Sequence, residues 1–285
     1  VFLDESIVEL ALQSLTLHRD YPDYVEANLS FHVEMTRSPL CQAVYKNSDC
    51  YDLTIGLMVE HNEAKSVCTP ALLLLLNMAA GDAHCARFEK DDDLRVILNT
   101  LRFFVDKESV QAIGSQLLNT LASHVRVCAR LIALEAVHVM CEAVNRYQDN
   151  ETIQICATHT LSHFTVEESC VMAMLNHGLV TTYLGVLGHF ADNQEVQCTV
   201  LEVMAVLCGT PMGCTTFFNE NGLMCVFSAI SAFPEDPMLL AFCCDIIASC
   251  IHTISQNDTY PVLLHNNRVA APVETVVEMY SMPSK

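Results

Sequence analysis

The stretch Val110-Gln-Ala-Ile-Gly-Ser-Gln-Leu-Leu-Asn-Thr-Leu-Ala122 recurs, in its order of apolar and polar positions, from Ile153 and again from Val196. The interval is 43 residues, and it extends back to Val67 and forward to Leu239. A period in the forties with two apolar helical patterns per unit is typical of a stacked helical array, in which each unit buries its apolar face against its neighbours. Five further registers keep the interval: Leu75, Leu118, Leu161, Met204 and Ile247; Met78, Leu121, Phe164, Leu207 and Cys250; Leu94, Val137, Val180 and Leu223; Leu98, Cys141, Leu184 and Phe227; Phe104, Tyr147, Phe190 and Phe233.

Each unit contains three stretches with the spacing of helices. One runs from about residue 109 to residue 122, where apolar or small residues fall on one helical face. A short helix is expected near residues 126–133, and another helix over residues 137–147. The unit therefore consists of three helices and ends at a tight turn.

An acidic residue occupies that turn in every unit. We expect its carboxylate to accept hydrogen bonds from the first free amides of the next helix and to meet the positive end of the helix dipole. This structural role is preferred to an acidic binding ridge. The acids that share the register are Glu63, Asp106, Asp149, Asp192 and Glu235.

The pattern resembles the armadillo repeat over residues 67–251, and more loosely at both ends. The stretch 110–122 and its copies look like the third helix of that family, with an apolar-Gln start, a small residue four positions on and an Asn-Leu-Ala-like end. Asn176-His-Gly178 and Asn221-Gly222 are similar to the Gly-led turn that opens the family's next helix. The resemblance implies an all-α, right-handed superhelical armadillo-like solenoid of about six repeats. Three helices per unit favour it over the two-helix HEAT repeat.

We expect residues 1–285 to form one armadillo-like repeat domain, because a solenoid has no internal boundary. Its regular repeats cover about residues 63–251, and its outer repeats, 1–62 and 252–285, are irregular. The chain begins at Val1 inside a helical pattern, so we expect it to be a piece of a longer protein.

Both ends depart from the regular spacing. Near the start, one face follows the second apolar pattern one residue out of step; its members are Ile7, Leu10, Ala11 and Leu17. A further helix opens at Tyr21-Pro-Asp-Tyr-Val25 with Asp23 as the expected cap, and residues 37–51 predict a loop or irregular turn. After residue 251 the pattern returns with about three residues inserted, at Val269, Val273, Val276 and Tyr280.

The charge of the chain is negative and unevenly distributed. The formal net charge is −20, and no Lys or Arg lies between Arg146 and Arg268, a stretch that holds twelve Asp and Glu. This argues against nucleic acid and anionic membrane surfaces as partners, because both require Lys and Arg. No uncharged apolar run reaches the roughly 18 residues that a membrane-spanning helix needs. Two interpretations stay open: a solvated acidic surface that keeps the protein soluble, and a surface for a basic or amine-bearing partner.

The fifteen cysteines do not form a disulfide pattern. Cys141 and Cys250 fall on core registers, no C-x-x-C pair occurs, and the number is odd. We expect free thiols in a reducing compartment, which favours a cytoplasmic or nuclear location. Cys198, Cys208 and Cys214 cluster in sequence, so a redox or metal pair is an alternative to buried core thiols.

In armadillo proteins the third helices line a concave groove. The resemblance implies that solvent-facing positions two and six residues before the end of each third helix meet the ligand. Peptide-carrying members place Trp and Asn there, but this chain has no Trp and only Asn77 matches, so a nuclear-import signal is not the expected ligand. The predicted partner-binding residues are Asn77, Gln116, Thr120, His159, His163, Glu202, Asp245 and Ser249; Leu73 and Val206 occupy the remaining positions.

A zinc site is an alternative interpretation of part of this surface. His159 and His163 lie four residues apart on one helical face, and Glu202 follows at the same register in the next unit. The metalloprotease motif fails because Thr160, and not Glu, follows the first His. We prefer ordinary groove residues, and therefore predict no metal and no cofactor.

The sequence predicts a non-catalytic interaction scaffold that binds an extended, basic protein segment in an acidic concave groove. The alternative is a structural or regulatory module that packs against other domains of a larger parent protein. No phosphate loop, nucleophile elbow or kinase signature supports an enzyme.

Overall fold

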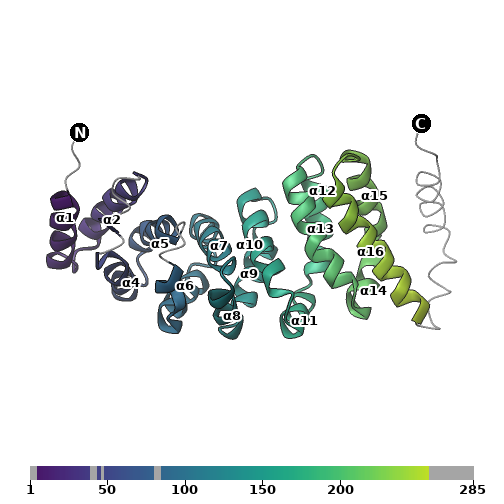
Figure 1. The fold of residues 1–285 in the computed structure, drawn as a ribbon, viewed down its shortest axis with the longest axis horizontal. Helices are drawn as coiled ribbons and strands as arrows, with labels where there is room; N and C mark the ends of the chain where they lie inside the picture. The colour runs from purple at the N-terminus through teal and green to yellow at the C-terminus, as the bar shows by residue number, and fades with distance from the viewer. Residues whose placement is uncertain (1–4, 39–43, 46–47, 80–84, 257–285) are drawn as a thin grey trace.

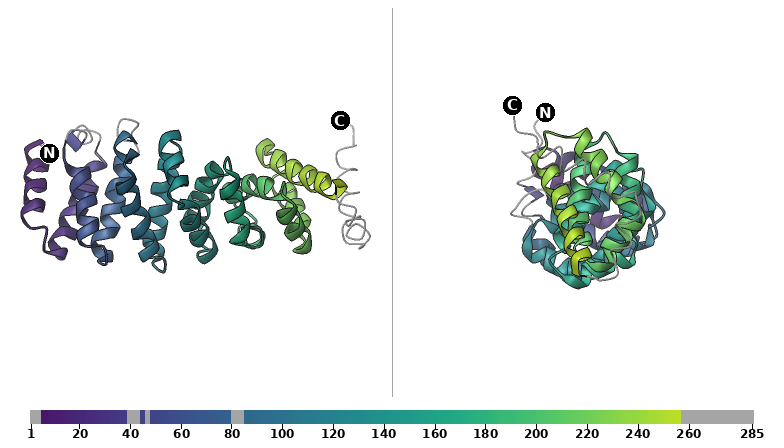
Figure 2. Two further views of the ribbon diagram at one scale, coloured as in Figure 1. Left: turned by 90° about the horizontal axis from the view of Figure 1, so that it is seen from below. Right: turned by 90° about the vertical axis from the view of Figure 1, so that its right-hand side faces the viewer.

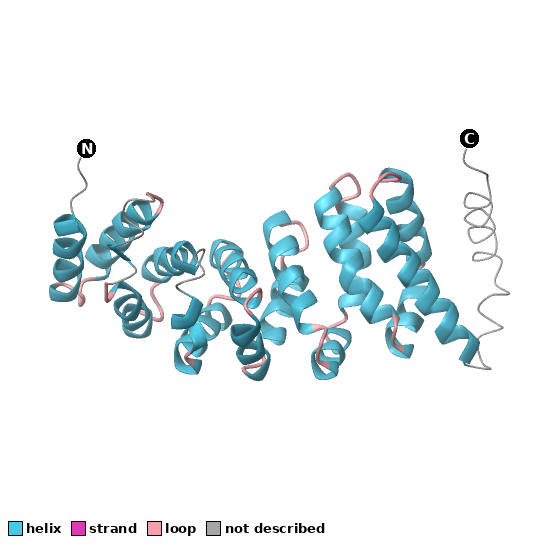
Figure 3. Ribbon diagram, in the orientation of Figure 1, coloured by secondary structure: helices cyan, strands magenta, loops and turns pink. Residues whose placement is uncertain are grey.

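The computed structural model describes residues 5–38, 44–45, 48–79 and 85–256, which contain fifteen α-helices and one 3-10 helix. Short turns join the helices, and no strand occurs in these residues (Figure 3). The helices follow one another along the longest axis of the molecule from α1 to α16 (Figure 1), and most stand across that axis (Figure 2). The predicted all-α stack of repeats is therefore confirmed.

The helices form three rows along the stack. We call the row that contains the longest helices the third-helix row; each of its members packs against the next. It consists of α2 (Pro22–Thr36), α5 (Lys65–Ala79), α7 (Glu108–Ala122), α10 (Glu151–Phe164), α13 (Gln194–Cys208) and α16 (Pro237–Gln256). The second row consists of α1 (Glu5–Leu17), α4 (Cys50–Glu60), α6 (Asp91–Phe103), α9 (Ala136–Arg146), α12 (Leu179–His189) and α15 (Gly222–Ala232). The short helices are η1 (Cys85–Glu89), α8 (Val125–Ala133), α11 (Glu168–Asn176) and α14 (Pro211–Asn219).

The registers found in the sequence form the core between units. The register of Val67 is fully buried in all five units, and so are Leu118, Leu161 and Met204. Ile247, in the last described helix, is only partly buried. One register thus supplies one layer of side chains per unit, which explains the constant interval.

A buried glutamine joins the second and third helices within three units. Gln111, Gln154 and Gln197 are each no more than 2% exposed. Each Nε2 donates to two carbonyl oxygens at the end of the preceding second-row helix; for Gln111 these belong to Leu101, at 2.8 Å, and Phe104, at 3.1 Å. The Gln of the apolar-Gln start is therefore structural, because it satisfies carbonyls that have no partner within their own helix.

The predicted capping role of the turn acids is wrong by one residue. All five acids are exposed, and the cap position is the residue after them. Asn150 and Asn193 accept hydrogen bonds from the Ile153 and Val196 amides at 2.9 and 3.1 Å, and Asp236 does the same for Leu239. Lys107 occupies this position in α7, which has no side-chain cap. The turn is one residue longer than the pattern suggested, so the acids point to solvent.

The predicted face of the first helix is also wrong. Val8 and Leu15 are buried, whereas Ile7, Leu10 and Leu17 are exposed. The buried pair lies 86 residues, two full periods, before Leu94 and Leu101 of α6, so this helix keeps the register without a slip. Exposed apolar residues beside the true face produced the false match.

Helix α2 begins with Tyr21 as its cap residue and Pro22 in its first turn. The expected cap, Asp23, lies inside the first turn, and Tyr21 provides no side-chain cap. Proline suits this position because its missing amide would have no partner there.

The predicted loop over residues 37–51 is only partly described. Tyr45 is buried there, and α4 begins at Cys50. At the other end, α16 continues to Gln256, and Val269, Val273, Val276 and Tyr280 lie outside the described residues.

The turn before three second-row helices uses a left-handed residue. Gly178 and Asn221 have φ of 72° and 59°, as the similarity to the Gly-led turn predicts. Glu135 occupies the same register with φ of 58°, which the sequence pattern did not reveal. Only Gly adopts this conformation without steric cost, so the turn geometry is imposed by the repeat.

No single helix in the described ranges is long and apolar enough to cross a membrane. Helices α11 and α12 are long and apolar enough only when they are taken together, and a bend of 71° separates them.

Candidate functional site

The candidate surface is the third-helix face, the side of the third-helix row that faces away from the other two rows. In α5 after Ser66, and in α7 after Ser109, every residue is buried or half-buried. By contrast, α6 in the second row presents a stripe of exposed residues that includes Asn99 and Phe103. The neighbouring helices therefore cover the side chains of α5 and α7 in part, and no exposed stripe projects from the middle of the third-helix face.

The predicted binding residues are distributed along this row. Gln116, His159, Glu202 and Asp245 lie one on each of the consecutive helices α7, α10, α13 and α16. The first three are half-buried, and Asp245 is exposed. The second predicted line consists of Asn77, Thr120, His163 and Ser249, one on each of α5, α7, α10 and α16. Both lines follow the row, and binding by them remains a prediction.

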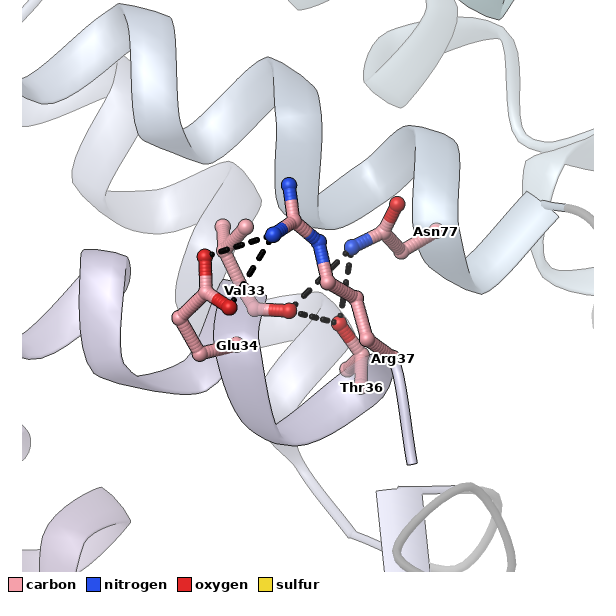
Figure 4. Close-up of polar contacts among 5 residues, drawn as sticks. All are labelled: Val33, Glu34, Thr36, Arg37 and Asn77. Atoms are coloured by element: carbon pink, nitrogen blue, oxygen red, sulfur yellow. Dashed lines mark hydrogen bonds and ion pairs between the residues drawn. The ribbon is translucent and has the colours of Figure 1, made fainter. Parts of the chain in front are cut away.

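The side chain of Asn77 forms hydrogen bonds within the protein. Its Nδ2 donates to the Val33 carbonyl oxygen at 3.3 Å and to Thr36 Oγ1 at 3.0 Å, so it holds α5 to α2 (Figure 4). The ion pair of Arg37 with Glu34, at 2.9 Å, lies beside these bonds (Figure 4). The amide oxygen of Asn77 points away from both acceptors (Figure 4). A ligand can therefore meet the oxygen of Asn77 without disturbing the contact between the two helices.

His159 and Glu202 take part in a second link between neighbouring third helices. His159 Nε2 donates to Thr199 Oγ1 at 2.8 Å, since that hydroxyl itself donates to the Glu195 carbonyl oxygen. Ser162 Oγ donates to Glu202 Oε1 at 2.8 Å. Within the described residues no group of three His, Cys, Asp or Glu side chains is arranged to hold a metal ion. His159 and Glu202 instead bond to hydroxyl groups of the neighbouring third helices.

Some polar side chains of the face form no hydrogen bond or ion pair within the described residues. In the described part of the chain, the side chains of Gln116, Asn119 and Asp245 form no hydrogen bond or ion pair. Thr120 donates to the Gln116 carbonyl oxygen of its own helix at 3.0 Å. The amides of Gln116 and Asn119 are thus half-buried and free to pair with another backbone. The sequence reasoning missed Asn119, although it is the Asn of the quoted stretch.

The charge imbalance persists in the structure. Between Arg146 and the last described residue, no Lys or Arg is available to pair with an acid. The acids there meet neutral donors, for example Asn193 Nδ2 on Glu151 at 2.7 Å and Gln194 Nε2 on Asp236 at 2.6 Å. Hydrogen bonds from neutral groups leave the negative charge in place, so this half of the surface remains strongly acidic.

The cysteine cluster is buried and differs from the predicted one. Cys208, Cys214 and Cys250 are at most 1% exposed, and Cys214 Sγ donates to the Cys250 carbonyl oxygen at 3.9 Å. Hydrogen bonding to Cys208 is the largest effect that raises the pKa of Cys250. Cys198 lies half-buried on the third-helix face, where burial raises its pKa. The thirteen cysteines with described side chains are free, and burial raises the pKa of core thiols such as Cys141 and Cys243, which disfavours their reactive thiolate form.

A cleft of about 480 Å³ lies outside this face, between α4 and α6. Its apolar walls include Val59 and Phe103, which are 53% and 57% exposed. Sequence reasoning missed the cleft because both residues fall outside the core registers. Its lining residues are Met58, Val59, Asn62, Glu63, Val96, Asn99, Thr100 and Phe103.

Comparison with known proteins supports the repeat assignment. The family model described as LRRK2 ARM repeat matches residues 44–214, more than half of the chain. The crystal structure of an engineered protein aligns with a TM-score of 0.60 at 14% identity, covering 86% of this chain and 97% of that one. A structure from work on a phosphorylation switch between cadherin and beta-catenin aligns with a TM-score of 0.65 at 12% identity, covering 88% of this chain and 54% of that one. At such identities the two structures support the fold alone. No curated protein sequence matches the chain.

Proposed function

The chain belongs to the LRRK2 ARM repeat family, and we propose that it is a non-catalytic protein-interaction scaffold. Its third-helix face binds an extended, Lys/Arg-rich segment of another protein in the cytoplasm.

The polar chemistry of the face carries this proposal. The half-buried amides of Gln116 and Asn119 have no protein partner among the described residues, and the acids Glu202 and Asp245 have no Lys or Arg near them in sequence. An extended segment presents backbone groups to the amides and cationic side chains to the acids. The structure studied for cadherin and beta-catenin, proteins that interact, has a similar fold. Free cysteines suit the reducing cytoplasm.

The test is binding of a fluorescein-labelled Lys/Arg-rich peptide, measured by fluorescence anisotropy. Two exposed or half-exposed charge contacts, each worth about 0.2–1 kcal/mol, predict that Glu202→Gln with Asp245→Asn weakens binding roughly two- to thirty-fold. The matched control is Asp192→Asn with Glu235→Gln, which removes the same charge from exposed turns. Equal weakening by both pairs would mean that the peptide responds only to net charge, and no binding to the wild type would reject the proposal.

A second candidate function is docking against another domain of a longer parent protein. The cleft between α4 and α6 favours it, since exposed Phe103 and Val59 offer apolar surface that an adjacent domain would cover. Hydroxyl-radical oxidation of Phe103 tests this idea. Slower oxidation in the intact parent than in this chain supports docking, and equal rates contradict it.

A further inference from the structure

The chemistry of the third-helix face changes along the row. On α5 and α7 the half-buried residues of the face include no ionisable side chain. On α10, α13 and α16 the face carries His159, His163, Glu202 and Asp245. A segment lying along the whole row therefore meets two different environments in succession.

The first environment is apolar, and the protein covers its side chains only in part. Leu73 and Leu76 of α5 and Ile113 of α7 pack against the core, yet each remains half-buried. Each of these side chains therefore keeps part of its apolar surface accessible to a ligand that lies along the row. Covering them with apolar side chains of the ligand removes further apolar surface from water, which favours binding.

The second environment is acidic. Glu202 and Asp245 lie on neighbouring helices, and the described part of the chain after Arg146 offers them no Lys or Arg. Ser162 donates a hydrogen bond to Oε1 of Glu202, and Oε2 has no hydrogen-bond partner among the described residues. A cationic side chain from a ligand therefore has acceptors here that no cation of this region already occupies.

Helix spacing sets the distance between the two environments. Packed helices lie about 8–10 Å apart, and an extended chain advances about 3.3 Å per residue. A ligand thus spends about three residues on each helix. The middle of the α5–α7 pair and the middle of the α13–α16 pair are three helices apart in the row, which corresponds to about nine residues.

We infer that the ligand is a bipartite segment, with two apolar side chains on Leu73, Leu76 and Ile113 and, about nine residues away, a Lys/Arg pair on Glu202 and Asp245. The free amides of Gln116 and Asn119 pair with the ligand backbone between the two parts. This inference rests on the proposed function and specifies the partner of the same surface.

A peptide series tests the spacing. Labelled peptides of about 20 residues on a Gly/Ser/Thr background carry a Leu pair and a Lys-Arg pair separated by roughly 3, 9 or 15 residues, in both chain orders, bracketing the spacing derived above. Control peptides lack one of the two pairs. The expected result is tightest binding at the middle separation, about ten-fold tighter than the peptide without Leu, which corresponds to about 1.4 kcal/mol.

Protein variants locate the apolar contact. Leu73→Gln and Ile113→Thr install residues found at the same registers in other units, Gln116 and Thr199, so the fold tolerates them, as thermal melts will verify. We expect both to remove the advantage of the Leu pair and to leave the basic-only peptide unaffected.

The outcomes separate the two proposals. If the basic-only peptide binds through Glu202 and Asp245 but neither the Leu pair nor its separation matters, the bipartite ligand is rejected and the proposed function stands. If no peptide binds, the proposed function fails, and the inference fails with it. The peptide comparison needs no variant, so a misfolded variant does not obscure the result.

Discussion

The units before and after Arg146 connect to their neighbours by different chemistry. Before it, cations make many of the links, for example Arg130 Nη1 to Asp91 at 2.6 Å and Lys90 Nζ to Asp52 at 3.1 Å. After it, neutral side chains do the same work, as when Asn193 Nδ2 donates to Glu151 at 2.7 Å.

This difference indicates that the stack needs hydrogen-bond donors between units and does not need cations. Both regions share the buried registers and the glutamine that ties the second helix to the third. The absence of Lys and Arg between Arg146 and Arg268 is therefore not imposed by the fold. That freedom is the physical basis for proposing a cationic ligand.

The largest expected effect tests whether the two regions share one core. Leu118→Ala, before Arg146, and Leu161→Ala, after it, each remove a fully buried side chain. Each should lower the free energy of unfolding by about 2–5 kcal/mol in denaturant melts. A loss below about 0.5 kcal/mol in either variant, the range of surface changes, would break the equivalence of the two regions.

The next effect concerns the N-terminal end, where we expect the stability to depend on pH. His32 is fully buried, its Nδ1 lies 2.7 Å from Tyr45 Oη, and burial lowers its pKa to about 4. Because the unfolded chain, with a His pKa of about 6.5, then binds more protons than the folded chain, stability falls as pH decreases from about 6.5 towards 4. Over this pH range the free energy of unfolding falls by up to about 3 kcal/mol.

Hydrogen exchange of α2 as a function of pH measures this effect. His32→Leu introduces the residue type of Leu75, which occupies the corresponding position in α5, and should flatten the pH dependence between about 6.5 and 5. An unchanged profile in that variant would show that another group controls the acid response.

A smaller effect concerns the caps. Asn193→Ala removes the side-chain bond to the Val196 amide and the bond to Glu151, and we expect it to cost about 1–2 kcal/mol. Lys107 lies at the same register but provides no side-chain cap. The amides of α7 in Lys107→Ala should therefore keep their protection from hydrogen exchange. Similar fraying of α7 and α13 in the two variants, followed by hydrogen exchange, would contradict the cap assignment.

The smallest effect tests the central comparison itself. Arg130→Gln replaces the cation that links α8 to α6 by the kind of neutral donor used after Arg146. Both partners are more than 40% exposed, so the cost should be below about 0.5–1 kcal/mol. A much larger loss in thermal melts would mean that the first region does depend on cations.

The sequence predicted the fold well because the same registers recur in every unit, so a core position found in one unit identifies the corresponding positions in the others. Registers such as that of Val67 describe a layer of the core, and one layer fixes the next. Predictions failed where a single residue decides the geometry: at the caps, where Asn150 and not Asp149 meets the helix, and in α1, where Val8 and not Ile7 is buried. Periodicity locates a helix but leaves its boundary and its exact face uncertain by one residue.

The candidate site was predicted less completely. The register placed Gln116, His159, Glu202 and Asp245 on consecutive helices of one row, but it does not show which side chains are already occupied. Asn77 and His159 bond to neighbouring helices, and such lateral bonds depend on residues about 40 positions away, which no local pattern reveals.

Photo-crosslinking tests the central claim most directly. A Lys/Arg-rich peptide with a benzophenone side chain is irradiated on the protein, and the modified residues are identified by mass spectrometry. We predict crosslinks on the third-helix face of α10, α13 and α16, close to His159, Glu202 and Asp245. Crosslinks concentrated at the exposed turn acids Asp192 and Glu235, or in the cleft between α4 and α6, would contradict it.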